Sequence, residues 1–374
     1  MPRPPDFDPS AVRMQGSPFS AAVIAAPPEF ALHVGDSWRA PAECARTESF
    51  PEDAHPGIHR YAGTQGTPDL IEAVTGKLRR ANELRVDPEN VLITAGATGA
   101  LSCAIGALAS PGDEILILAP FWPLIRGIVR AFRTTPVEVP FYDRVASAAE
   151  VVEAVRARHS PRCVALYVST PSNPTGRLIP AEWLEALADF ARRENLLLLS
   201  DEVYESYVYD APHVSLGRFA QERTFSAFSF SKAYAMAGDR IGYLCGPRAG
   251  IAHARKIATH TFYTAPTVGQ RAALGALEGA APWLDETRDS YRTTGIEAAR
   301  VLGVDPPQGG CFLFLPIGDR NVESFLADCL AEGVALAPGS ASGEAYTAWV
   351  RLCFTTLPPP RALEGVRRVA KLLA

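Results

Sequence analysis

Short apolar runs alternate with amphipathic stretches along the first two thirds of the chain. The runs VLIT (91–94), EILIL (114–118), VALYV (164–168) and LLLL (196–199) have the length and composition of buried strands, and the short run PVEV (136–139) continues the pattern. The stretches between them repeat apolar residues at helical spacing, and the first begins with Thr67 followed by a proline, which is typical of a helix start. This order predicts an α/β fold in which helices cover both faces of a mostly parallel sheet.

The last third of the chain has a different pattern. A long helical region near 283–302 is followed by an apolar run at 311–317, a helix at 321–332 and a second apolar run at 349–354. We therefore expect a smaller α+β domain after a large one. The predicted division is an N-terminal arm that joins the small domain (1–40), a large domain (41–284) and a C-terminal small domain (285–374).

Composition and charge narrow the possible functions. The 374 residues are 47% hydrophobic and 21% charged, with a net charge of −5 and no block of basic residues, so binding to nucleic acid or to an anionic membrane is not expected. The seven cysteines are dispersed without a C-x-x-C pair, which favours reduced thiols over disulfides or a zinc site. The start MPRPPDFDPS lacks a signal-peptide pattern, and no window has the length of a membrane span, so we expect a cytoplasmic protein.

Polar residues with possible catalytic roles follow the predicted strands, where sites form in parallel sheets. Asp201 ends the LLLLSD run and could keep a pyridine nitrogen protonated, while Tyr204 could donate to a phenolate oxygen; a turn cap and core packing are the alternatives. Lys232 is the only lysine in the 178 residues between Lys77 and Lys256. Its apolar surroundings favour a neutral amine that condenses with a carbonyl over a solvated surface lysine.

Other residues could bind the charged groups of a cofactor and a substrate. The turn GATG (96–99) precedes a predicted helix, whose N-terminal amide groups suit a phosphate. Ser229 and Arg240 flank Lys232 and could complete such a cradle. Trp122 could stack on a planar ring or belong to the core, and Arg351, inside the apolar run WVRLCF, could pair with a protein acid or bind a substrate carboxylate.

Taken together, these pieces resemble the fold-type I pyridoxal-phosphate enzymes, and specifically the class I/II aminotransferases. The resemblance extends from about Leu32 to the C-terminus. Its motifs occur in the expected order, namely LHVGDS, RYAGTQGTPDL, GATGAL, PSNPTG, DEVYESYVY, SFSKAYAMAGDRIGY, GGCFLF, PGSASG and VRLCF. One such motif is weak support, but the ordered set is specific.

The resemblance implies a role for each matching residue. Lys232 would form the Schiff base with pyridoxal 5'-phosphate and carry the proton, with Asp201 at the ring nitrogen and Trp122 stacked on the ring. Asn173 and Tyr204 would contact the phenolate oxygen. The phosphate would be held by Gly96, Ala97, Thr98, Ser229 and Arg240, with Tyr61 reaching it from the other subunit of a homodimer. Arg351, helped by Gly35 and Asn173, would bind the substrate α-carboxylate. The implied reaction moves an amino group between an L-amino acid and a 2-oxo acid.

Three departures from the family pattern and two other functions stay open. Ser342 stands where relatives usually carry phenylalanine, Asp239 precedes Arg240 where an apolar residue or asparagine is common, and YRTTGIE (291–297) lacks the usual arginine pattern. A lyase, cyclase or synthase using the same lysine would need the same residues. A ligand-sensing module of a DNA-binding regulator is the other alternative, although no helix-turn-helix pattern precedes Gly35. Arg39 is a candidate for a substrate side-chain carboxylate by proximity alone.

Overall fold

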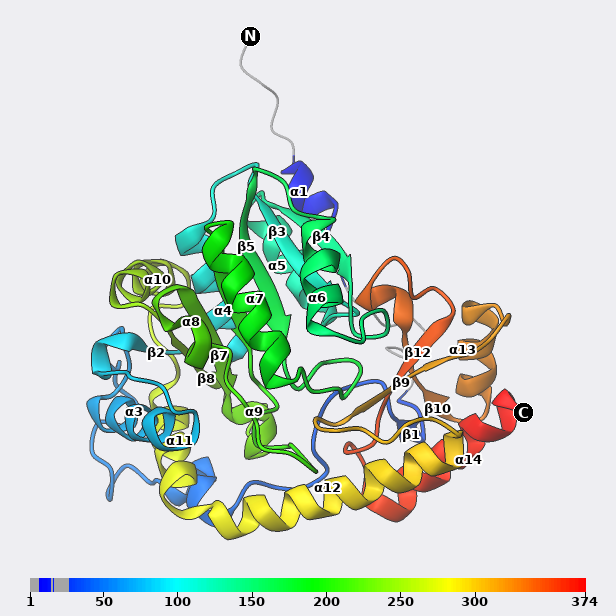
Figure 1. Ribbon diagram of the computed structural model, residues 1–374. Helices are drawn as coiled ribbons and strands as arrows, with labels where there is room; N and C mark the ends of the chain where they lie inside the picture. Colours follow the sequence, from blue (N-terminus) through cyan, green and yellow to red (C-terminus); the bar gives the residue numbers. More distant parts are fainter. Residues whose placement is uncertain (1–6, 15, 17–26) are drawn as a thin grey trace.

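The structure is a computed structural model that describes residues 7–14, 16 and 27–374. Within these ranges the chain forms one large α/β body and a smaller body beside it, joined below by a long helix (Figure 1). The described helices include none long and apolar enough to cross a membrane. Parts of the predicted arm (1–40), namely residues 1–6, 15 and 17–26, lie outside the described ranges. The short helix α1 (Pro9–Val12) lies against the large body, where Asp8 pairs with Arg133 at 2.9 Å.

A seven-stranded sheet forms the centre of the large body, with the order β2-β8-β7-β6-β5-β3-β4. Its strands are β2 (Val91–Ala95), β3 (Glu114–Ala119), β4 (Thr135–Pro140), β5 (Cys163–Ser169), β6 (Leu197–Asp201), β7 (Thr224–Ser229) and β8 (Ile241–Cys245). Only β8 runs against its neighbours in this sheet, and the other pairings are parallel. The predicted mostly parallel sheet is therefore confirmed.

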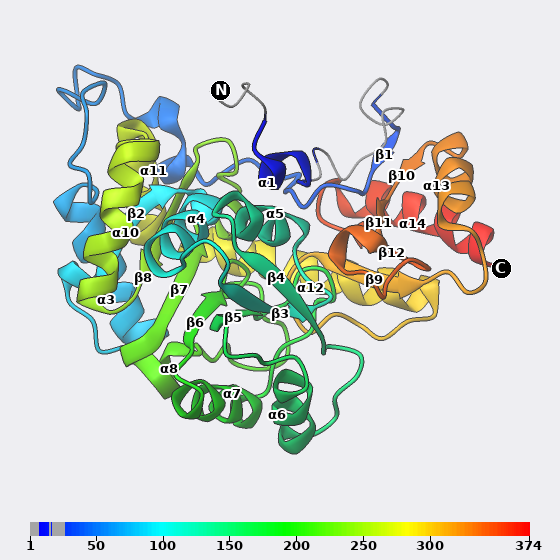
Figure 2. The same cartoon turned by 90° about the horizontal axis from the view of Figure 1, so that it is seen from above.

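Helices cover both faces of this sheet, as Figure 2 shows edge-on. One face carries α4 (Gly96–Leu108), α5 (Pro123–Ala131) and α10 (Arg248–Thr261), whose apolar residues join a single buried cluster with the strands. The opposite face carries α6 (Ala148–Arg156), α7 (Ala181–Arg193) and α8 (Gly217–Ala220). At the β2 edge, α3 (Pro68–Ala81) and α11 (Thr267–Gly279) close a third cluster. Both faces are thus apolar, which accounts for the uninterrupted hydrophobic runs in the strands.

The smaller body is built on an antiparallel sheet of order β11-β12-β9. Its elements are β9 (Phe312–Pro316), α13 (Val322–Ala331), β10 (Val334–Ala335), β11 (Ala337–Pro338), β12 (Trp349–Cys353) and α14 (Pro359–Leu373). The N-terminal strand β1 (Phe30–Ala31) pairs in parallel with β10, so the beginning and the end of the described chain share this body. Helix α12 (Ala281–Leu302) connects it to the large body and runs beneath both (Figure 1).

The elements predicted from apolar runs lie within a few residues of the observed ones. Two strands of the large sheet were not predicted, because β7 (TFSAFS) and β8 (IGYLC) mix apolar residues with serine, glycine and cysteine. Helix α3 begins at Pro68 as expected, but the Thr67 side chain makes no capping hydrogen bond. The Thr67 amide instead donates to Gln270 Oε1 at 2.8 Å, which ties α3 to α11.

Gly242 in β8 provides a test of how tightly this sheet packs against α4. A Cβ atom there would lie 2.6 Å from Phe228 O, 2.7 Å from Gly96 C and 2.8 Å from Ala97 N, all backbone atoms. We expect Gly242→Ala to lower the free energy of unfolding by about 1–3 kcal/mol, because backbone atoms must shift to admit the methyl group. Urea unfolding followed by circular dichroism measures this change.

Gly127 in α5 is the matched control, since a Cβ atom there meets nothing within 4 Å. Gly127→Ala should stabilise the protein by about 0.5–1 kcal/mol through helix propensity. Equal effects of the two substitutions would contradict the packing argument.

Candidate functional site

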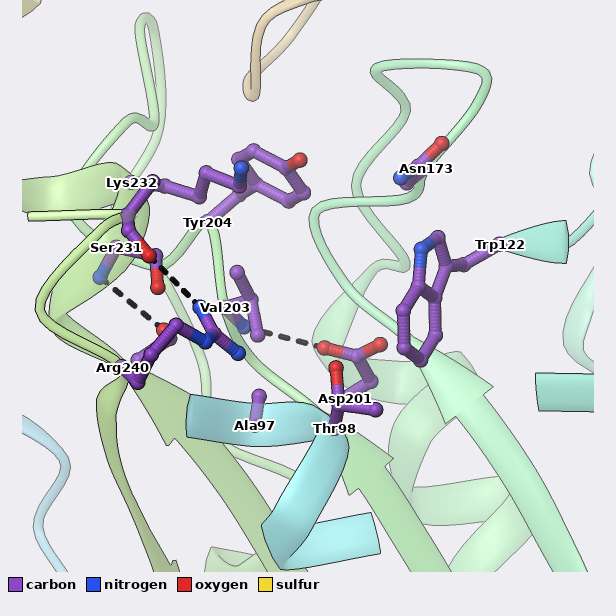
Figure 3. A pocket seen from close by; sticks show the side chains of 12 residues that line it. Ala97, Thr98, Trp122, Asn173, Asp201, Val203, Tyr204, Ser231, Lys232 and Arg240 are labelled. Atoms are coloured by element: carbon purple, nitrogen blue, oxygen red, sulfur yellow. Dashed lines mark hydrogen bonds between the residues drawn. The ribbon is translucent and has the colours of Figure 1, made fainter. Parts of the chain in front are cut away.

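A cavity of about 140 Å³ opens at the carboxyl ends of the parallel strands. The residues that line it come from the ends of strands and the starts of helices in the large body (Figure 3). They are Ala97, Thr98, Trp122, Asn173, Asp201, Val203, Tyr204, Ser229, Ser231, Lys232, Ala237 and Arg240. Nine of these twelve were predicted as site residues from the sequence, so the structure brings most of the predicted set together.

Lys232 is positioned by the short helix α9 (Phe230–Ala233), which follows β7 directly. Ser229 caps this helix by accepting a hydrogen bond from the Ser231 amide at 3.1 Å. The Lys232 ammonium donates to the Gly35 carbonyl oxygen, and Tyr207 Oη donates to the Lys232 carbonyl oxygen at 3.0 Å. The backbone of Lys232 is therefore fixed, while its amine extends toward Tyr204 and the cavity in Figure 3.

Asp201 lies at the end of β6 with only 6% of its surface exposed. Its Oδ2 atom accepts a hydrogen bond from Tyr167 Oη at 2.6 Å, and Oδ1 accepts one from the Val203 amide at 3.3 Å. Burial raises the pKa of the Asp201 carboxyl to about 6, although both hydrogen bonds oppose this effect. A buried carboxylate with free accepting capacity suits a cationic partner in the cavity.

The start of α4 and Arg240 form a cradle at the other side of the cavity. Gly96 has a φ of 70°, and a Cβ atom at this position would lie 2.6 Å from Arg240 Nη2, so the close approach of this guanidinium requires glycine. Arg240 itself has a φ of 56°, and its Nη1 atom donates to Ala237 O at 2.8 Å. The amide groups at the start of a helix, together with an arginine, are suited to bind a phosphate.

Arg351 reaches the large body from β12 of the small one. Its Nη1 atom donates to Asn173 Oδ1 at 3.0 Å and its Nη2 atom to His33 O at 2.8 Å, and the guanidinium lies 4.4 Å from the centre of the Phe312 ring. Within the described residues, Arg351 has no ion pair, and its buried Nε atom has no hydrogen-bond partner. Burial lowers the pKa of this guanidinium. The arrangement fits an anionic ligand better than a structural role.

Several predicted residues lie outside this set. Tyr61 is 84% exposed and packs edge-on against Tyr263, with ring centres 5.1 Å apart, so it does not enter the cavity of its own chain. Gly35 borders the site through its bond with Lys232. Arg39 pairs with Glu286 at 2.9 Å beside the rings of Trp38 and Trp283, and it does not line the cavity.

The unexplained positions Asp239 and Ser342 also have definite surroundings. Burial and the charge of Glu48 raise the pKa of Asp239. No ion pair joins Asp239 to Arg240 in the described part of the chain. Ser342 is buried, and its carbonyl oxygen accepts a hydrogen bond from the Phe121 amide at 2.9 Å, so it borders the segment that carries Trp122.

Sequence reasoning missed four residues of the site. Val203, Ser231 and Ala237 line the cavity and lie between predicted residues in the segments 201–204 and 229–240, a signal that the sequence contains. Tyr167, the hydrogen-bond partner of Asp201, lies within the apolar run VALYV and looked like core. Only the pairing of β5 with β6 reveals its position.

The fold and the site define a class of enzyme, and comparison with known proteins agrees. The family described as aminotransferase class I and II matches residues 31–369, and the chain belongs to this family. It is similar to the aspartate/prephenate aminotransferase of Thermus thermophilus, with 36% identity over 327 residues and 84% of each chain covered. The arginine–pyruvate transaminase of Pseudomonas aeruginosa is 31% identical over 325 residues, covering 84% of this chain and 82% of that protein. The solved structure of a double mutant of Thermus thermophilus aspartate aminotransferase superposes with a TM-score of 0.89 at 31% identity, covering 98% of this chain and 100% of the other.

The protein is therefore a fold-type I, pyridoxal-phosphate-dependent aminotransferase that moves an amino group between an amino acid and a 2-oxo acid. The residues of the cavity fit this cofactor. The buried Asp201 carboxylate suits a protonated pyridine nitrogen, and the glycine-dependent cradle of Arg240 suits a phosphate. Lys232 supplies an amine in the lining of the same cavity.

The raised pKa of Asp201 predicts a pH-dependent stability of the cofactor-free protein. The carboxyl titrates at about 6 when folded and at an ordinary value of 3.8 when unfolded, so the folded state loses stability as the pH rises between these values. Asp201→Asn lacks this titration. From pH 5 to pH 8, we expect the free energy of unfolding of the wild type to fall by about 1–2 kcal/mol relative to that of the variant. Urea unfolding of both cofactor-free proteins at the two pH values measures the difference, and a constant difference would contradict the assignment.

Proposed function

We propose that the cavity holds pyridoxal 5'-phosphate through contacts from three directions. The amide groups of Gly96, Ala97 and Thr98, with Ser229 and Arg240, bind the phosphate, supported by the positive φ of Gly96 and the proximity of its Cα to the Arg240 guanidinium. Asp201 faces the ring nitrogen, and Trp122 stacks on the ring. Asn173 and Tyr204 contact the phenolate oxygen; burial keeps the pKa of Tyr204 well above its usual value, so its phenol donates.

Lys232 is the proposed catalytic amine. When bound, the cofactor supplies an electron sink that makes the proton at the substrate Cα labile. Lys232 Nζ, which lines the cavity, would accept this proton from the substrate Cα and later release it. The Gly35 carbonyl, which accepts a hydrogen bond from the amine in this structure, holds the side chain near that path.

In this proposal Arg351 binds the substrate α-carboxylate. The observation that supports this role is that the Arg351 guanidinium is buried and has no ion-pair partner among the described residues. A buried guanidinium with a free Nε atom costs free energy unless an anion joins it. Asn173 Oδ1 and His33 O orient two of its nitrogen atoms and leave the third available for a carboxylate. The carboxylate then lies between β12 and the loop after β5, next to Lys232.

A homodimer completes the site by contributing Tyr61. This side chain points away from its own cavity and, with Tyr263, forms an exposed aromatic pair. Exposed aromatic residues favour a protein interface. Tyr61 of each subunit donates to the phosphate held by the other one.

The amino donor in this proposal is an amino acid, as the relatives' names indicate, and the identity of its side chain is left open. Those names include aspartate, prephenate and arginine, so the family accepts different side chains. Arg39 and Arg126 are both paired with acids, Glu286 at 2.9 Å and Glu138 at 3.2 Å, and neither lines the cavity, so we assign neither to a second substrate carboxylate. The domain division at residues 40 and 284 and the cytoplasmic location stay predictions.

Adding amino acids to the loaded enzyme tests the function and the role of Arg351 together. A donor should convert the bound cofactor to its pyridoxamine form, seen as a change in the absorption spectrum. Arg351→Lys loses the planar fork that matches a carboxylate, so we expect the KM for the donor to rise about 10-fold or more while the cofactor stays bound.

Arg292→Lys is the matched control, because Arg292 pairs with the exposed Asp210 at 2.7 Å on the outer side of α12. Its KM should stay at the wild-type value. An unchanged KM in Arg351→Lys would overturn the assignment of the carboxylate site, and release of a product without any pyridoxamine form would overturn transamination.

Mixing two inactive variants tests the dimer. Tyr61→Ala lacks the tyrosine but keeps Lys232, and Lys232→Ala keeps the tyrosine. A hybrid dimer has one site with both residues if Tyr61 crosses the interface. After random exchange of subunits at equal amounts, we expect about a quarter of the wild-type activity. A mixture that stays inactive although size-exclusion chromatography shows exchanged dimers would place Tyr61 in its own subunit's site or outside any site.

A further inference from the structure

Among the described residues, Tyr167 is the only one whose side chain donates a hydrogen bond to the Asp201 carboxylate. Tyr167 itself does not line the cavity. It lies in the middle of β5, which pairs in parallel with β6 in the register Tyr167 with Leu199 and Ser169 with Asp201. Residues two apart on a strand share a face, so Tyr167 and Asp201 are diagonal neighbours on the face covered by α4. The phenol reaches the carboxylate along this diagonal, with Oη 2.6 Å from Oδ2.

Both partners of this bond are removed from water. Tyr167 has no exposed surface, and burial raises its pKa well above the usual value, with the Asp201 charge as the next cause. The phenol is therefore neutral at any working pH and can only donate to the carboxylate. Asp201 Oδ2 accepts this short bond, whereas the one bond that Oδ1 accepts, from the Val203 amide, is long at 3.3 Å, so Oδ1 is the more weakly engaged oxygen.

The other ionisable groups near Asp201 either raise its pKa or make no hydrogen bond to its carboxylate oxygens. Glu202, the next residue, is fully buried and raises the pKa of Asp201 by its charge. It accepts hydrogen bonds from Ser200, Ser215 and His213 at 2.9, 2.6 and 2.8 Å, on the other side of the strand. Tyr142 donates to the carbonyl oxygen of Ser169 and not to Asp201. Tyr167 is thus the described side chain that favours the charged form of Asp201.

We propose that Tyr167 is a positioning residue that keeps Asp201 ionised and turns its Oδ1 atom toward the cofactor ring. The proposal rests on the role of Asp201 given above. With the cofactor bound, the proton between Asp201 Oδ1 and the ring nitrogen would stay on the nitrogen, because the Tyr167 donor on Oδ2 lowers the basicity of the carboxylate. This shift of the proton toward the nitrogen needs no further proton donor or acceptor, because the proton moves only along one hydrogen bond.

The test is Tyr167→Phe in the holoenzyme reconstituted with pyridoxal phosphate labelled with 15N in the ring. A protonated pyridine nitrogen has a chemical shift well separated from that of a neutral one. We expect the wild type to show the protonated value and Tyr167→Phe to move toward the neutral value. We expect kcat to fall about 10-fold, the equivalent of about 1.4 kcal/mol for one hydrogen bond to a charged group. In the cofactor-free variant, the pKa of Asp201, followed by 13C-carboxyl NMR, should rise above the wild-type value.

Tyr346→Phe is the matched control, since it removes the same atom from the same kind of pair. Tyr346 is buried, and its Oη atom donates to Asp143 Oδ1 at 2.6 Å, but Asp143 does not line the cavity around Lys232. Its ring 15N shift should equal that of the wild type. A wild-type 15N shift and wild-type kcat in Tyr167→Phe would overturn the proposal.

Asp201→Asn separates this proposal from the function on which it rests. If Asp201→Asn leaves the 15N shift and turnover unchanged, the assigned role of Asp201 is wrong, and the role of Tyr167 is wrong with it. If Asp201→Asn changes both and Tyr167→Phe changes neither, only the Tyr167 proposal is overturned.

Should Tyr167→Phe fail to fold, 3,5-difluorotyrosine at position 167 keeps the ring and the hydroxyl group and makes it a stronger donor. The pKa of Asp201 in the cofactor-free protein should then fall, and an unchanged or higher pKa would contradict the proposal.

Discussion

Burying a carboxylate at the end of a parallel strand is the constraint on which the rest of this site depends. Asp201 follows a run of four leucines and has little contact with water, so its charge is costly unless hydrogen bonds and a cation compensate it. The protein supplies two donors, Tyr167 and the Val203 amide, and leaves the cation to a ligand. The apolar strands that make the sheet stable thereby also bury a carboxylate whose charge a cationic group would stabilise, which is why we propose that it faces the ring nitrogen.

The second buried charge, the Arg351 guanidinium, also lacks an ion-pair partner among the described residues and comes from the smaller body. Arg351 is carried by β12 and donates a hydrogen bond to Asn173 of the large body, so the proposed carboxylate site lies where the two bodies meet. Three hydrogen bonds tie the segment from Gly339 to Tyr346 to the large body close to Trp122. They join Ser342 O to the Phe121 amide, the Glu344 amide to Glu138, and Tyr346 to Asp143. The distance between the two charges is thus set by packing between the bodies, and in the proposed function this distance limits the substrates that fit.

The sequence predicted the class of fold and most of the cavity because both follow from local patterns. Asp201 and Lys232 directly follow strands, and strand ends converge at one edge of a parallel sheet. Tyr167 could not be predicted in this way, since its role depends on the register between β5 and β6, which no local pattern contains. Arg39 failed as a candidate for the opposite reason. It is near Gly35 in sequence, but its guanidinium turns to Glu286 and two tryptophan rings on and beside α12.

Asp239 is next to Arg240 in the sequence but makes no ion pair with it in the described part of the chain, so it is not part of the proposed phosphate cradle. An acid directly before Arg240 would be expected to weaken an anion site, yet the charge that acts on Asp239 is that of Glu48. Arg240 has a left-handed backbone conformation, and its guanidinium lies close to Gly96 at the cavity. The cradle therefore depends on backbone conformation at two residues, Gly96 and Arg240, and adjacent charges in the sequence are poor guides to its affinity for phosphate.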